Sequence, residues 1–209
     1  YAGSALSGGS GVAKDEIRAV ANYAKACEAN DGEGCRLLGI KQFNGDGTTK
    51  NMQATRISME RACDLGNAWG CELLATTWSA TDEGATIDWP KAVALYERAC
   101  MARRGSACEH LADRFARGEG TAQNYTRAYA IYNEACTLGV ATACTTAGIA
   151  FFDGNLIPKD TQRGLAFLKS GCDKGDQRGC RIMAQATAIQ TQQSASQLYD
   201  QALAAARAN

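Results

Sequence analysis

Apolar residues recur along this chain with the spacing of one helix face. After each of five cysteines, apolar or small residues follow at three, four and seven or eight positions. These are Leu38, Gly39 and Phe43; Leu74, Ala75 and Trp78; Leu111, Ala112 and Phe115; Ala147, Gly148 and Phe151; and Met183 and Ala184. The spacing predicts an amphipathic helix in each unit, which we call helix A. The small residue at the fourth position should let a neighbouring helix approach closely.

A second apolar stripe leads up to the other cysteine of each pair. The residue four positions before that cysteine is Tyr23, Met59, Tyr96, Tyr132 or Leu168. The residue directly before the cysteine is alanine or glycine. This stripe predicts a second helix, helix B. Glycine-rich turns at 45–47, 118–120 and 153–154 should end helix A, whereas residues 81–90 read as a longer, irregular turn. Short loops from helix B to the next helix A predict antiparallel neighbours.

All ten cysteines stand in pairs of the form C-x7-C, and the first members recur every 36 or 37 residues. A fixed period indicates a repeat protein. Because the end of helix B and the start of helix A should lie side by side, the two cysteines of a pair can meet at bridging distance. The predicted disulfides are Cys27–Cys35, Cys63–Cys71, Cys100–Cys108, Cys136–Cys144 and Cys172–Cys180.

Evenly paired cysteines favour an oxidising compartment. Free thiols that bind metal or do redox chemistry are the alternative. Zinc sites, however, use closer cysteine spacing with histidines nearby, and the chain has one histidine, His110. We therefore expect no metal and no cofactor. We expect a periplasmic or secreted protein whose signal peptide has already been removed.

Charge and composition limit the kinds of partner that this protein is expected to bind. The 22 basic residues balance the 22 acidic ones, so the chain lacks the positive charge of a nucleic-acid binder. No apolar run approaches the ~20 residues of a membrane span. Residues 1–13 have the composition of a flexible linker. Residues 14–209 are expected to form one array of about five αα units, closed by a capping helix over 194–207, and we expect a monomer.

The repeat resembles the Sel1-like repeat, a relative of the tetratricopeptide repeat. The resemblance rests on Leu38-Gly39 followed by Phe43 and Gly45-Asp46-Gly47, and on Lys91-Ala92 followed by Tyr96 and Ala99. The added cysteines resemble the cysteine-rich Sel1-like proteins typified by the Helicobacter members. The resemblance implies an all-α solenoid, a right-handed superhelix of αα-hairpins with one disulfide per repeat. It also implies secretion, and binding of proteins or peptides.

The same resemblance implies an alternative function, because some relatives bind β-lactams or hydrolyse them weakly. The alternative is therefore a β-lactam or peptidoglycan-fragment binder with β-lactamase-type activity. The sequence itself gives no support for an enzyme, since it contains neither a G-x-S-x-G nor an S-x-x-K motif. We assign no catalytic residue.

Binding is expected on the concave side of the array, which helix A should line. The stripe of helix A opposite the predicted core consists of Leu37, Ile40, Lys41, Asn44, Leu73, Thr76, Thr77, His110, Asp113, Arg114, Arg117, Thr146, Ile149 and Asp153. Apolar residues next to arginines suit a protein or peptide ligand. Packing of the leucines and isoleucines against neighbouring helices is the alternative interpretation.

Overall fold

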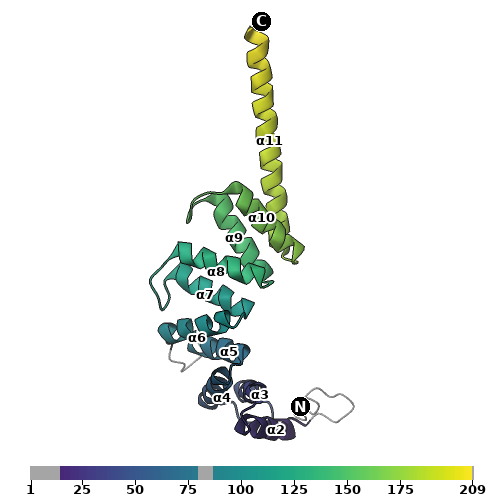
Figure 1. Ribbon diagram of the computed structural model, residues 1–209. Helices are drawn as coiled ribbons and strands as arrows, with labels where there is room; N and C mark the ends of the chain where they lie inside the picture. Colours follow the sequence, from purple (N-terminus) through teal and green to yellow (C-terminus); the bar gives the residue numbers. More distant parts are fainter. Residues whose placement is uncertain (1–14, 80–86, 209) are drawn as a thin grey trace. The chain divides into compact units, whose positions relative to one another are not determined.

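The computed structural model describes residues 15–79 and 87–208, and every regular element in these ranges is a helix (Figure 1). The expected linker over 1–13 lies outside the described residues, as does most of the expected irregular turn after Ser79. The chain divides into two compact units, one up to Asn124 and the other from Tyr125. Helix pairs repeat within each unit, which confirms the all-α repeat architecture.

The helices alternate as the sequence predicts. In the first unit, the B helices are α2 (Glu16–Glu28), α4 (Met52–Asp64) and α6 (Trp89–Met101), and the A helices are α3 (Gly32–Asn44), α5 (Ala68–Ser79) and α7 (Gly105–Arg117). In the second unit, the B helices are α8 (Tyr125–Thr137) and α10 (Thr161–Asp173). They are joined there by the A helices α9 (Ala141–Asp153) and α11 (Gln177–Ala208).

The B helices begin at a shared capping position, twelve residues before the first cysteine of the pair. The side chains of Asp15, Asn51, Asp88 and Asp160 each accept a hydrogen bond from the backbone N–H three residues on, at 2.9–3.0 Å. Such caps satisfy a backbone donor that has no partner inside the helix. The caps keep the period of the cysteines, so these four repeats carry the same start signal.

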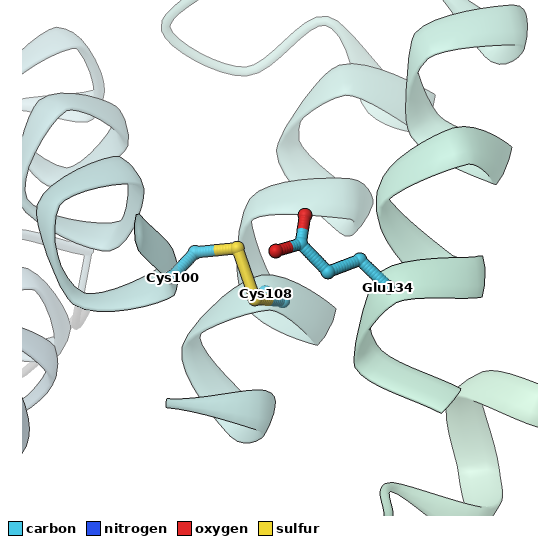
Figure 2. A group of neighbouring side chains, drawn as sticks. All are labelled: Cys100, Cys108 and Glu134. Atoms are coloured by element: carbon cyan, nitrogen blue, oxygen red, sulfur yellow. A yellow bond between two sulfur atoms is a disulfide. The ribbon is translucent and has the colours of Figure 1, made fainter. Parts of the chain in front are cut away.

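The junction between helix B and the next helix A is closely packed. A Cβ added at Gly34 would lie 2.5 Å from the Cβ of Ala26, and one added at Gly70 would lie 2.6 Å from the Cβ of Ala62. This approach brings each cysteine pair together, with Cα–Cα distances of 4.4–4.7 Å in all five pairs. Figure 2 shows one of these bridges, between Cys100 at the end of α6 and Cys108 in α7. The five predicted disulfides are confirmed.

The glycine turns after helix A behave as predicted. Gly45, Gly118 and Gly154 follow α3, α7 and α9 with φ of 84°, 72° and 74°. The backbone N–H of each donates to a carbonyl in the last turn of its helix. Glycine takes this left-handed conformation without a steric penalty, so the sequence fixes where these helices end.

A second left-handed position lies three residues after the first cysteine of each pair. Glycine occupies it in three repeats, whereas Asn30 and Arg103 have φ of 62°. Arginine is strained there because its Cβ crowds the backbone. We expect Arg103→Gly to raise the free energy of unfolding by about 0.5–1 kcal/mol. Arg103→Ala removes the same side chain but keeps the strained Cβ, and should give no gain. Chemical denaturation of both variants checks this, and an equal gain in both would contradict it.

The end of the chain differs from the expected arrangement. The segment 194–207 is helical, but it continues α11 without a break instead of forming a separate helix (Figure 1). The physical reason is visible in the sequence, since neither glycine nor proline occurs after Gly179. Nothing there ends a helix after nine or ten residues, as the glycine turns do elsewhere. Within the described part of the chain, no helix is both long and apolar enough to cross a membrane.

Candidate functional site

In the first unit, the predicted stripe converges on an apolar cavity between α3, α4 and α5. Four of its residues line this cavity of about 130 Å³, namely Ile40, Leu73, Thr76 and Thr77, together with Phe43, Thr55 and Met59. Ile40 and Leu73 are half-buried, and Thr76 is exposed. Helix B residues form the floor because the small Gly39 lets Met59 approach, an added Cβ at Gly39 lying 2.8 Å from its terminal methyl group.

The volume of this cavity limits what it can hold. A cavity of about 150 Å³ accommodates one benzene-sized group, whereas pockets for drug-sized molecules measure about 300–1,000 Å³. The space between α3, α4 and α5 therefore fits one apolar side chain of a larger ligand.

The remaining polar residues of α3 are engaged within the fold. Lys41 Nζ lies 2.6 Å from Glu16 Oε2 and 3.5 Å from Asp46 Oδ2. Burial lowers the pKa of Lys41, but the hydrogen bonds and charges of Glu16 and Asp46 outweigh it, so the pKa is raised. Asn44 donates to the same Asp46 carboxylate at 3.2 Å. Lys41 and Asn44 thus fix the turn after α3. Leu37, one turn before Lys41 on the same helix, is half-buried.

The α7 residues of the stripe separate into different roles. Arg114 Nη1 lies 2.5 Å from Glu119 Oε2, and its guanidinium lies 4.8 Å from the ring centre of Trp89. Its side chain is mostly buried, so it fixes the turn after α7. Arg117 is exposed and Asp113 is half-buried. The ring centre of His110 lies 5.2 Å from that of Tyr96, and its Nε2 is 3.9 Å from Glu72 Oε1.

Sequence reasoning missed an exposed aromatic residue on the same face of α5. Trp69 is 42% exposed, and it precedes Leu73 by four residues and Thr76 by seven, so the three share one helix face. The guanidinium of Arg36 lies 3.9 Å from its ring centre and that of Arg104 lies 4.8 Å away. Extending the stripe by one turn toward the N-terminus of the helix would have found it.

Two carboxylates, the buried Glu72 and the partly exposed Glu33, hold those two arginines in place. Arg104 Nε bonds to Glu72 Oε2 at 2.5 Å, and Arg36 Nε bonds to Glu33 Oε2 at 2.7 Å. The hydrogen bonds from Arg36 lower the pKa of Glu33. Burial of Glu33 partly opposes this shift, and a hydrogen bond from Asn67 adds to it. Charged and stacked in this way, the guanidinium groups keep Trp69 in a defined position.

In the second unit, the α9 residues of the stripe line a separate, more polar cavity. Thr146, Ile149 and Asp153 border a space of about 190 Å³ with Tyr129, Ala150, Asn155, Leu156 and Arg178. Arg178 Nη2 lies 3.4 Å from the hydroxyl of Thr146. The predicted stripe therefore falls on two surfaces, one in each unit.

All ten cysteines are committed to disulfides. A disulfide sulfur is not a thiolate, and the thiolate is the form of cysteine that binds metal or attacks as a nucleophile. Metal or redox chemistry at the C-x7-C pairs would therefore need reduced protein.

Antiparallel helix pairs at a constant period, each closed by its own disulfide, define an αα-repeat protein. Five copies of the Sel1 repeat match residues 1–31, 32–67, 84–103, 105–140 and 141–176. The chain belongs to the Sel1 repeat family.

Solved structures with the same fold are similar to this chain. A Sel1 repeat protein from Oxalobacter formigenes is 24% identical with a TM-score of 0.75, over 85% of this chain and 72% of that one. A protective antigen of uropathogenic Escherichia coli with the SLR fold is 23% identical with a TM-score of 0.78. That match spans 88% of this chain but 39% of the antigen.

A third similar structure shares the cysteine-rich character. Helicobacter pylori cysteine rich protein B is 29% identical with a TM-score of 0.50, over 63% of this chain and 93% of that one. A comparison with curated proteins found no significant match.

Proposed function

We propose that this protein is an extracytoplasmic scaffold that binds a protein or peptide partner through the A helices of its first unit. Sel1 repeat proteins are generally protein-interaction scaffolds. The observation that carries the finer proposal is the row Trp69, Leu73 and Thr76 on α5, which leads to an apolar cavity. Together with Ile40 and Phe43 of α3, we call this row the α3–α5 surface.

The chemistry of the α3–α5 surface suits a partner's apolar side chain. Tryptophan flanked by arginines is the composition of binding hot spots, where a few residues supply most of the affinity. The cavity beside it has the volume of one side chain. The partly exposed Arg104 adds hydrogen-bond donors at the rim, whereas the buried Arg36 supports the tryptophan ring from below the surface. A partner would therefore insert an aliphatic or aromatic residue and cover the tryptophan.

The disulfides support both the location and the mode of binding. Five bridges in one chain persist in oxidising compartments and are reduced in the cytosol. They also hold each helix junction rigid, so little conformational entropy is lost when a partner binds. We therefore place the partner in the periplasm or outside the cell.

Affinity capture from periplasmic and secreted fractions tests the proposal with matched variants. Trp69→Ala removes the exposed aromatic ring, and Thr76→Trp fills the mouth of the cavity. Trp69→Ala should lower recovery of the partner at least about tenfold, because truncation of a hot-spot residue costs about 2 kcal/mol or more. Thr76→Trp should lower recovery as well, because the partner's side chain can no longer enter the cavity. Ile57→Asp is the control, since Ile57 is an exposed apolar residue on helix B. Equal recovery by all four proteins would show that the α3–α5 surface does not bind the partner.

A further inference from the structure

Within each unit, a helix A packs against the next helix B in a fixed register. A Cβ added at Gly148 would lie 2.8 Å from Leu168 Cγ, and one added at Gly164 would lie 2.7 Å from the backbone nitrogen of Phe152. Gly39 faces Met59 in the same way. The residue four positions after the second cysteine of one repeat thus faces the residue four positions before the first cysteine of the next.

Among the described residues, the helix A at the start of α11 presents this face without a helix B packed on it. Ala184 occupies the position of Gly39, Ala75 and Gly148, which are all buried, yet it is exposed. Ala188, one turn further, is exposed as well, and Ile189 follows with half of its surface exposed. The start of α11 is therefore an acceptor face with small residues at the positions that receive a helix B.

The tail of the same helix carries the sequence of a helix B. Ala195-Ser-Gln-Leu198-Tyr199-Asp-Gln-Ala202 repeats the pattern Ala92-Val-Ala-Leu95-Tyr96-Glu-Arg-Ala99 of α6. Leu95 and Tyr96 are 7% and 3% exposed in the core, whereas Leu198 and Tyr199 are both 66% exposed. The tail thus exposes to solvent the same Leu-Tyr pair that is buried in α6.

The tail cannot reach the acceptor face of its own chain. Ala184 and Tyr199 lie on one unbroken helix (Figure 1), and fifteen residues of helix separate them by about 22 Å. In complete repeats, seven residues that include a glycine connect helix A to helix B, as between Asn44 and Met52. Tyr199 follows Cys180 by five residues fewer than Met59 follows Cys35, so the connection before the helix B pattern is shorter in the tail. The tail connection also contains no glycine.

We propose that two copies of this chain pair through α11, the tail of each packing as helix B on the acceptor face of the other. The register seen in the complete repeats places Ala184 opposite Tyr199 of the second copy. This pairing is antiparallel and reciprocal, so it closes as a two-fold dimer. A shortened connection that prevents a return within one chain is the arrangement that favours exchange of an element between copies.

The composition of α11 fits this occupant. Between Thr187 and Ala208 it contains two charged residues, Asp200 and Arg207. Two charged residues seven apart in sequence do not form the i,i+3 or i,i+4 ion pairs that stabilise an exposed helix, and the described Ile189, Leu198 and Tyr199 leave apolar surface uncovered. The acceptor and tail residues Ala184, Ala188 and Tyr199 fall along one side of the helix, which a second copy would bury.

Sedimentation over a wide range of concentrations tests the dimer. The wild-type protein is expected to reach twice the chain mass. Tyr199→Asp should weaken the dimer at least about a hundredfold, because an aromatic anchor is lost at two equivalent places. Ala184→Lys should do the same from the acceptor side without altering the tail. Gln197→Asp introduces the same charge as Tyr199→Asp on the other side of the helix and should leave the dimer intact.

Two outcomes would overturn the inference. One is a wild-type protein that stays at the mass of one chain at every concentration. The other is a dimer that persists in Tyr199→Asp or in Ala184→Lys, since it would then form through another surface. These outcomes are independent of partner capture by the α3–α5 surface, because all three substitutions lie in α11.

Discussion

Reduction of the five disulfides is expected to unfold this protein. Each bridge closes a short loop, with a sequence separation of 8 residues, and is worth about 2.5 kcal/mol in the chain-entropy model. Five such bridges contribute about 10–15 kcal/mol, which equals the whole stability of a typical domain. Far-UV circular dichroism with and without a strong reductant should show loss of the helical signal at room temperature.

A graded experiment separates the bridges from general effects of the reductant. Replacing Cys63 and Cys71 together by alanine removes one bridge and should cost about 2–3 kcal/mol, measured by denaturation without reductant. The other four bridges remain in this variant, so it should stay folded. A reduced wild-type protein that keeps its full helical signal would contradict the expectation, and the array would then be held by packing alone.

Gly47→Ala is expected to be among the most damaging single substitutions on the surface. Gly47 has φ of 70°, and an added Cβ would overlap the backbone of Glu16 at the start of α2. The left-handed conformation costs a non-glycine residue about 1–2 kcal/mol, and the overlap adds about 1–3 kcal/mol because backbone cannot move aside easily. The free energy of unfolding should fall by about 2–5 kcal/mol, measured by chemical denaturation.

Gly66→Ala is the matched control for that substitution. Gly66 has φ of 82°, but an added Cβ there would have open space around it. Only the cost of the left-handed conformation applies there, so the free energy of unfolding should fall by about 1–2 kcal/mol. Equal losses at Gly47 and Gly66 would show that the second glycine of the turn does not position α2 against the end of α3.

The repeat architecture could be predicted because several local signals coincide. Helical spacing, turn glycines and paired cysteines all recur with one period, and each acts over a few residues. Gly45 and Gly118 end their helices where the sequence places the turns. The last repeat departs from prediction for the same local reason. Its helix lacks a stop signal after Gly179, so residues 194–207 extend α11.

The candidate site was predicted less completely. Helical spacing groups Ile40, Leu73 and Thr76, and these three residues line one cavity in the structure. It does not reveal which charges are already paired. Arg114 is held by Glu119, a residue in the following turn, so its place on the stripe does not make it available to a ligand. The exposed Trp69 lies one turn outside the stripe and gains its arginine neighbours from two other repeats.

The sequence by itself determined the helix order, the repeat boundaries and the disulfide partners, because these depend on neighbours within about ten residues. Only the tertiary structure decided which stripe residues are exposed, which side chains form ion pairs, and where small residues open a cavity. Those properties arise from contacts between repeats, about 30 residues apart in sequence, as between Arg104 and Glu72. The period of the chain brings such residues together, but their individual side chains decide what the surface can bind.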